Sequence, residues 1–83
     1  MKLLSALAVG LMLVGCVSAQ DYDKGLAAYD AGDYATALQE WRPLAEQGDA
    51  IAQHKVGAMY DLGEGVVQDY AEALKWYRLA AEQ

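Results

Sequence analysis

Side chains that could serve as nucleophiles are scarce in this sequence of 83 residues. Serine occurs only at Ser5 and Ser18, cysteine only at Cys16, threonine only at Thr36, and histidine only at His54. Acyl-transfer chemistry needs a nucleophile beside a base that a third group orients. Both serines and the cysteine lie in the first 19 residues, so the rest of the chain cannot assemble a serine or cysteine triad. We therefore expect no catalytic residues.

Carboxylates are the abundant reactive groups, with 12 Asp and Glu against 6 Lys and Arg. All 12 acids but only five of the basic residues lie in residues 20–83, so this part has a net charge of -7. A zinc site needs three or four ligands, and one histidine among scattered acids does not supply them. The turn Gly63-Glu64-Gly65 lacks the third glycine and the lysine of a phosphate-binding loop. We expect no metal, no cofactor and, because an acidic surface repels phosphates, no nucleic-acid partner.

The first residues have the pattern of an export segment. Lys2 precedes thirteen uncharged, mostly apolar residues, 3–15, which are too few to span a bilayer but fit the apolar part of a signal peptide. Cleavage after Val17-Ser18-Ala19 would define a signal peptide of residues 1–19. Alternatively, residues 13–16 resemble a bacterial lipobox, which would end the signal at residue 15 and place a lipid on Cys16. We expect a periplasmic or secreted protein, attached to the outer membrane if the lipobox is used.

The rest of the chain contains one motif twice. Residues 33–47 match residues 69–83 at nine of fifteen positions with an offset of 36. Residues 24–32 match residues 55–63 at five of nine positions with an offset of 31. A period in the mid-thirties is typical of helix-turn-helix solenoids. Apolar residues also recur at helical spacing, which predicts four helices near residues 21–31, 34–47, 50–62 and 70–82.

The residues between these helices are typical helix boundaries. Asp33, Asp49 and Asp69 each precede a predicted helix, where an aspartate accepts hydrogen bonds from the free backbone N–H groups. Glycines before the first two of these aspartates suit the end of the preceding helix. Trp41 and Trp76 lie on the apolar faces or beside them, and we expect both in the core.

Residues 50–83 resemble a Sel-1-like repeat, a subfamily of the tetratricopeptide repeats. The matching positions are Ala50, Ala52, Gln53, Gly57, Met59, Tyr60, Gly63, Gly65, Val66, Asp69, Ala73, Trp76, Tyr77, Ala80, Ala81, Glu82 and Gln83. Residues 20–49 resemble the shorter tetratricopeptide-like hairpin that often precedes such repeats. The resemblance implies an all-α superhelix of about four antiparallel helices that binds other proteins or peptides and has no catalytic activity.

In the resembled family, the first helix of each hairpin lines a concave groove. The resemblance therefore gives a candidate partner-binding face, which consists of Asp23, Ala27, Asp30, His54, Ala58 and Asp61. This face is acidic, so we expect basic or polar peptide segments as ligands. The alternative is an ordinary solvated surface, and His54 is then a surface residue without a ligand.

Three functions stay open at this point. The first is an exported, non-enzymatic protein that mediates protein–protein interaction in the bacterial envelope. The second is an accessory protein or hydrolase acting on peptidoglycan or β-lactams, as for relatives with paired cysteines, which this chain lacks. The third is a truncated remnant, because two repeats are fewer than the three that stacked arrays normally need. An uncovered last helix would also allow self-association.

Overall fold

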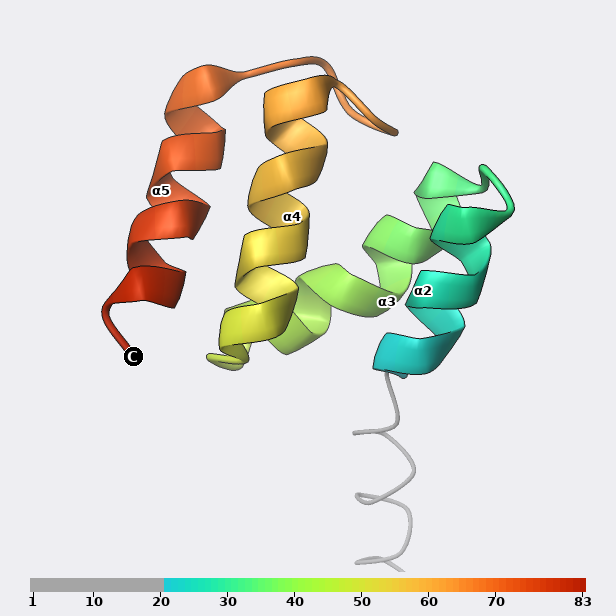
Figure 1. Cartoon of the computed structure of the whole chain (residues 1–83), viewed down its shortest axis with the longest axis horizontal. Helices are drawn as coiled ribbons and strands as arrows, with labels where there is room; N and C mark the ends of the chain where they lie inside the picture. Colours follow the sequence, from blue (N-terminus) through green and yellow to red (C-terminus); the bar gives the residue numbers. More distant parts are fainter. Residues whose placement is uncertain (1–20) are drawn as a thin grey trace, which may run out of the picture.

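The computed structural model describes residues 21–83 as four α-helices without a strand among them (Figure 1). They are α2 (Tyr22–Asp30), α3 (Tyr34–Glu46), α4 (Ala50–Leu62) and α5 (Tyr70–Ala81). Each begins and ends within about one residue of its prediction, so the all-α fold is confirmed. The predicted export segment and its lipidation site Cys16 lie outside the described residues. In residues 21–83, no helix combines the length and the apolar character that crossing a bilayer requires.

Aspartate side chains cap the N-termini of the helices, as the sequence predicts. The side chain of Asp33 accepts a hydrogen bond from the Thr36 backbone, and Asp69 does the same at α5. Asp49 accepts from two backbone N–H groups of α4. These three predicted caps are confirmed. Asp21, which the prediction placed inside the first helix, is a fourth cap and accepts from two N–H groups of α2.

Consecutive helices pack on one another in chain order, as in a solenoid. Packing joins α2 to α3, α3 to α4, and α4 to α5. In Figure 1, α4 and α5 lie side by side, and the loop between them reaches toward the turn that joins α2 to α3. The molecule is therefore two helical hairpins: the first hairpin (α2 and α3) and the second hairpin (α4 and α5).

The core runs through both hairpins and contains both tryptophans. Trp41 is fully buried and Trp76 is 6% exposed, which confirms the prediction for each. The indole N–H of Trp41 donates to the backbone oxygen of Tyr22 at 3.1 Å. The other core residues are small or aliphatic: Ala37, Ala45, Ala52, Val56 and Met59. Small residues let the helices approach closely, and the aromatic rings fill the remaining space.

The two hairpins close through equivalent contacts. In the first, Gly25 of α2 lies against the Trp41 ring; in the second, Gly57 of α4 lies against the Tyr77 ring. Trp41 and Tyr77 are 36 residues apart, as the sequence repeat predicts, but Gly25 and Gly57 are 32 apart. The first helices are thus related by an offset of 32 rather than 31.

The difference of one residue between the offsets of 31 and 32 arises at the C-terminal ends of α2 and α4. α2 ends at Asp30, two residues before its glycine, whereas α4 ends at Leu62, directly before Gly63. Both glycines, Gly32 and Gly63, have left-handed φ angles of 82° and 71°, which an L side chain rarely adopts. An alignment on these glycines therefore misses the packing register by one residue.

Candidate functional site

Two of the predicted face residues on α4 converge on α5. The His54 ring lies 5.2 Å from the Tyr77 ring, centroid to centroid. The Tyr77 hydroxyl donates to the Asp61 carboxylate at 3.5 Å. Burial, with the neighbouring Asp61 charge, raises the pKa of Tyr77. Ala58, between the two on the same helix, is half-buried. His54 and Asp61 therefore help to join α4 to α5 as well as reaching the surface.

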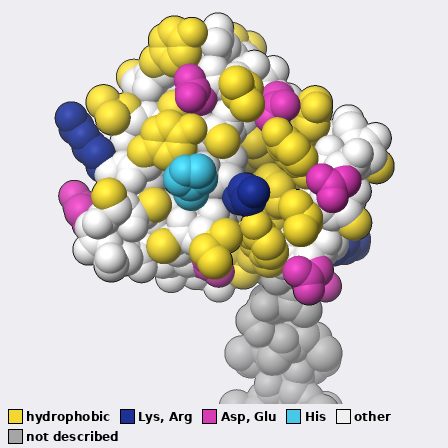
Figure 2. All heavy atoms as spheres, viewed as in Figure 1, with side chains coloured by type: hydrophobic (Ala, Val, Ile, Leu, Met, Phe, Trp, Pro, Cys, Tyr) yellow, Lys and Arg dark blue, Asp and Glu magenta, His cyan; other side chains and the backbone are white. Residues whose placement is uncertain are grey.

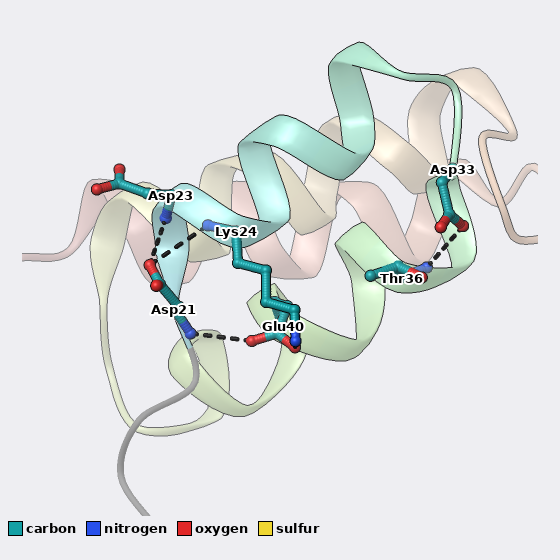
Figure 3. Close-up of polar contacts among 6 residues, drawn as sticks. All are labelled: Asp21, Asp23, Lys24, Asp33, Thr36 and Glu40. Carbon is teal, nitrogen blue, oxygen red and sulfur yellow. Dashed lines mark hydrogen bonds and ion pairs between the residues drawn. The ribbon is translucent and has the colours of Figure 1, made fainter. Parts of the chain in front are cut away.

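The predicted face residues on α2 are placed differently. Asp23, Ala27 and Asp30 are all exposed. In Figure 3, the Asp23 carboxylate points away from the cap formed by Asp21 and from the ion pair between Lys24 and Glu40. These acids are free of the hairpin contacts that His54 and Asp61 make.

The residues of α2 that correspond in space to His54 and Asp61 are aromatic. The Tyr22 ring stacks on Trp41 with centroids 5.6 Å apart and planes at 26°, and Tyr29 lies at the same centroid distance from Trp41. Each precedes, by one residue, the acid that the offset of 31 selects. Partner binding by the six predicted residues stays a prediction, but the structure gives the two sets different surroundings.

An open apolar groove of about 670 Å³ lies between α4 and α5. It is lined by Ala50, Ile51, His54, Lys55, Tyr77, Ala80 and Ala81. Ile51 is 61% exposed, although it is a large aliphatic residue. Figure 2 shows the histidine at the surface beside a basic side chain, with apolar side chains around the pair. We call this site the α4–α5 groove. Sequence reasoning found His54 in it but not its apolar walls.

At two positions beside the groove, α5 has smaller side chains than α3 has at the matching positions. The equivalents of Tyr77 and Ala80, 36 residues earlier, are Trp41 and Leu44. Trp41 is fully buried, and Leu44 is partly buried and packs against the core. At these two positions the first hairpin therefore packs larger side chains of its own than the second does. Comparing residue sizes between the copies could have indicated this.

Lys55 supplies a positive charge at the edge of the groove. Its ammonium nitrogen lies 5.9 Å from the Trp41 ring centroid, a cation–π distance that holds the side chain over the first hairpin. Among residues 21–83, ion pairs join Lys24 to Glu40 and Lys75 to Glu72, and Lys55 takes part in neither. The groove thus combines apolar walls with a cation that no carboxylate of these residues neutralises.

Other exposed apolar side chains also belong to the second hairpin and its loop. Within residues 21–83, the large hydrophobic residues that are exposed are Ile51, Leu62, Val67, Tyr70, Leu74 and Leu79. Leu74 and Leu79 line a smaller groove of about 440 Å³ on the outer face of α5. The matching face of α3, with Leu38 and Pro43, has a groove of about 270 Å³. The outer grooves therefore lie at matching positions of the two hairpins.

The loop between α4 and α5 makes a contact that sequence reasoning missed. Glu64 lies in the turn that the sequence predicts, and its carboxylate accepts a hydrogen bond from the Tyr29 hydroxyl at 2.5 Å. This bond, with burial and the Glu64 charge, raises the pKa of Tyr29 from 10.0 to about 12. The next residue, Gly65, lies against Tyr34 so closely that an added Cβ would be 2.9 Å from the Tyr34 Cβ. Glu64 and Gly65 of this loop therefore connect the second hairpin to the first.

The described residues offer no obvious reaction centre. Thr36 lies in the first turn of α3, where its N–H donates to Asp33, while His54 packs on Tyr77 of α5. In the part of the chain that the structure covers, no group of three or more His, Cys, Asp and Glu side chains is placed to hold a metal ion.

Comparison with known proteins assigns the second hairpin to a repeat family. Residues 50–83 match the family model described as Sel1 repeat, which confirms the resemblance of this segment. Over 59 residues the chain is 37% identical to an "Exopolysaccharide production negative regulator" of Rhizobium leguminosarum bv. viciae. The match covers 71% of this chain and 22% of the relative, so the chain spans about a fifth of that protein. No solved structure matches the chain.

Proposed function

Because residues 50–83 match a Sel1 repeat, we propose that the protein is a non-enzymatic adaptor that binds another protein through its second hairpin. Sel1 repeats typically mediate protein–protein interactions. The observation that carries the proposal is the α4–α5 groove, an apolar surface with Ile51 61% exposed in an otherwise acidic molecule. Exposed apolar patches rimmed by polar groups are typical of interaction sites.

The distribution of apolar side chains supports binding by this hairpin. Water-exposed apolar surface carries a free-energy cost of roughly 25 cal/mol per Å², and a partner that covers it removes that cost. In residues 21–83, the first hairpin exposes no large hydrophobic side chain. A partner therefore gains most by contacting α4, α5 and the loop that joins them.

The matched relative fits a role in regulation. Its name describes a negative regulator of exopolysaccharide production, not an enzyme. The segment that it shares with this chain covers 71% of this chain and about a fifth of the relative. We propose that the shared segment acts as a binding module, and that this chain influences a partner's activity by contact rather than by catalysis.

We further propose that the protein works in the bacterial envelope. The support is the pattern of Lys2 followed by an uncharged apolar run in residues 3–15. Mass spectrometry of the mature N-terminus tests this directly. A chain that starts at Gln20, or a lipid-modified chain that starts at Cys16, would support export. An intact N-terminus on protein recovered from the producing cells would contradict it.

Site-specific photo-cross-linking in producing cells tests the binding site. A benzophenone amino acid at position 51 lies in the groove, and the same group at the exposed Ala31 serves as the matched control. We expect a discrete protein adduct from position 51 that is absent from position 31. Identical adduct patterns from both positions, or no adduct from position 51, would contradict the proposed function.

A further inference from the structure

The α4–α5 groove has apolar walls and a positive charge at its edge. We infer that it binds a partner segment that presents a large apolar side chain next to a carboxylate. The occupant is thus an acidic amphipathic peptide segment of another protein. This inference rests on the proposed function and adds the chemistry of the partner. It is opposite in charge to the basic ligand that the sequence predicts.

The first hairpin indicates how large the apolar side chain of the partner should be. There, Trp41 and Leu44 occupy the positions at which the second hairpin has Tyr77 and Ala80. The first hairpin packs its own Leu44 against the core. A leucine or an aromatic ring of a partner would supply to the second hairpin the volume that Ala80 leaves empty. The groove walls, formed by Ile51, Ala80 and Ala81, offer such a side chain mainly apolar contacts.

Lys55 and its surroundings indicate that the partner segment should carry a carboxylate. Lys55 lies at the groove and takes part in neither ion pair of the described residues. The two nearest acids along α4 are otherwise engaged. Asp49 accepts hydrogen bonds from the backbone of Ile51 and Ala52, and Asp61 accepts from Tyr77. A partner carboxylate is the group that Lys55 can pair with.

The net charge of -7 in residues 20–83 acts over a longer range than this contact. At physiological ionic strength the Debye length is about 8 Å. Repulsion by exposed acids that lie farther from the groove than this length is then largely screened. A direct contact with Lys55 is screened much less. Local charge therefore decides selectivity in the groove, and the test is best made at physiological salt.

The test is a selection from a display library of random twelve-residue peptides against the full chain. Its counter-selection uses A80L, which places the first hairpin's own residue in the groove. We expect the enriched peptides to combine Leu, Phe or Trp with Asp or Glu. Their affinity, measured by fluorescence anisotropy, should fall about tenfold or more in A80L and in K55E. The control K75E makes the same charge change outside the groove, at a lysine paired with Glu72, and should bind as the unmodified chain does.

Several results would overturn the inference. They are enrichment of Lys- and Arg-rich peptides, binding that survives K55E, and a failure to enrich any peptide. Circular dichroism of A80L and K55E checks that their helices persist, because Lys55 also lies over the buried Trp41 ring. Cross-linking at position 51 separates this inference from the proposed function. If a partner is captured there but its cross-linked segment has no acidic residue, the adaptor role stands and the partner chemistry proposed here is wrong.

Discussion

The two hairpins of this molecule share a backbone design and differ in how they are filled. In the first, Trp41 is fully buried under Tyr22 and Tyr29 of the opposite helix. In the second, Tyr77 takes the same place but is half-buried, beside the smaller ring of His54. The comparison indicates that the size of the packed side chains contributes to whether a hairpin of this kind is filled or leaves a groove. Aspartates cap the N-termini of the helices in both copies, whereas the loops that join the two helices differ in length.

Replacing the closing ring should have the largest effect on stability, and it should be unequal between the hairpins. We expect W41A to lower the free energy of unfolding by about 3–5 kcal/mol, because it empties a fully buried site. Y77A should cost about 1–2 kcal/mol, since Tyr77 is half-buried. Urea unfolding followed by circular dichroism measures both. Equal losses would mean that the two hairpins are packed alike after all.

The glycines that face these rings provide a second test. A Cβ on residue 25 would lie 2.7 Å from the Trp41 Cδ1, and a Cβ on residue 57 would lie 2.9 Å from the Tyr77 ring. The buried Trp41 cannot move aside, whereas Tyr77 can turn toward the groove. We expect G25A to destabilise by about 1–3 kcal/mol and G57A by less, with the melting temperature as the measurement. A G57A protein that melts below G25A would argue against this difference in freedom.

The contact between the hairpins predicts a pH dependence. The pKa of Tyr29 is raised from 10.0 to about 12 in the folded chain, so this hydroxyl favours folding as long as it stays protonated. Its contribution is complete below pH 10 and is lost as the pH rises toward 12. Y29F should cost about 1 kcal/mol at neutral pH and should weaken the loss of stability in this range. Unfolding measured between pH 8 and 11 tests it, and unchanged curves in Y29F would exclude the role of this bond.

The helix caps should show the smallest effect and the least difference between the copies. Asp33 and Asp69 each accept one backbone N–H, at 3.2 and 3.1 Å. We expect D33A and D69A each to cost about 0.5–1 kcal/mol. Asparagine at either position should restore most of the loss, because it can also accept the hydrogen bond. Thermal melting of the four variants is the measurement, and a clear difference between the two alanine variants would contradict the equivalence of the caps.

The features that the sequence predicted are those that local chemistry determines. Helix periodicity and aspartate capping act over a few residues, so the four helices and three of the four caps could be located without a structure. The burial of Trp41 followed from the apolar stripe. The offset of 31 failed because it aligned Gly32 with Gly63, whereas packing aligns Gly25 with Gly57.

The groove and the loop contact depend on long-range packing. An alanine at position 80 means little until Leu44 is known to pack in the matching place of the other hairpin. Likewise, nothing near Glu64 in the chain shows that Tyr29, 35 residues away, will meet it. The candidate site was therefore predicted only in part, through His54, Ala58 and Asp61 on the helix that forms one of its walls.

The loop between α4 and α5 links the second hairpin to the hairpin that precedes it in the chain. Glu64 and Gly65 reach back to Tyr29 and Tyr34 of the preceding hairpin, so each unit built this way would brace the unit before it. Deleting the second hairpin would remove the contacts that its loop makes with the first. Deleting the first hairpin would leave the contact of Gly57 with Tyr77 in place. Two hairpins linked in this way should unfold in a single cooperative transition. Each further hairpin added at the C-terminal end would stabilise the one before it.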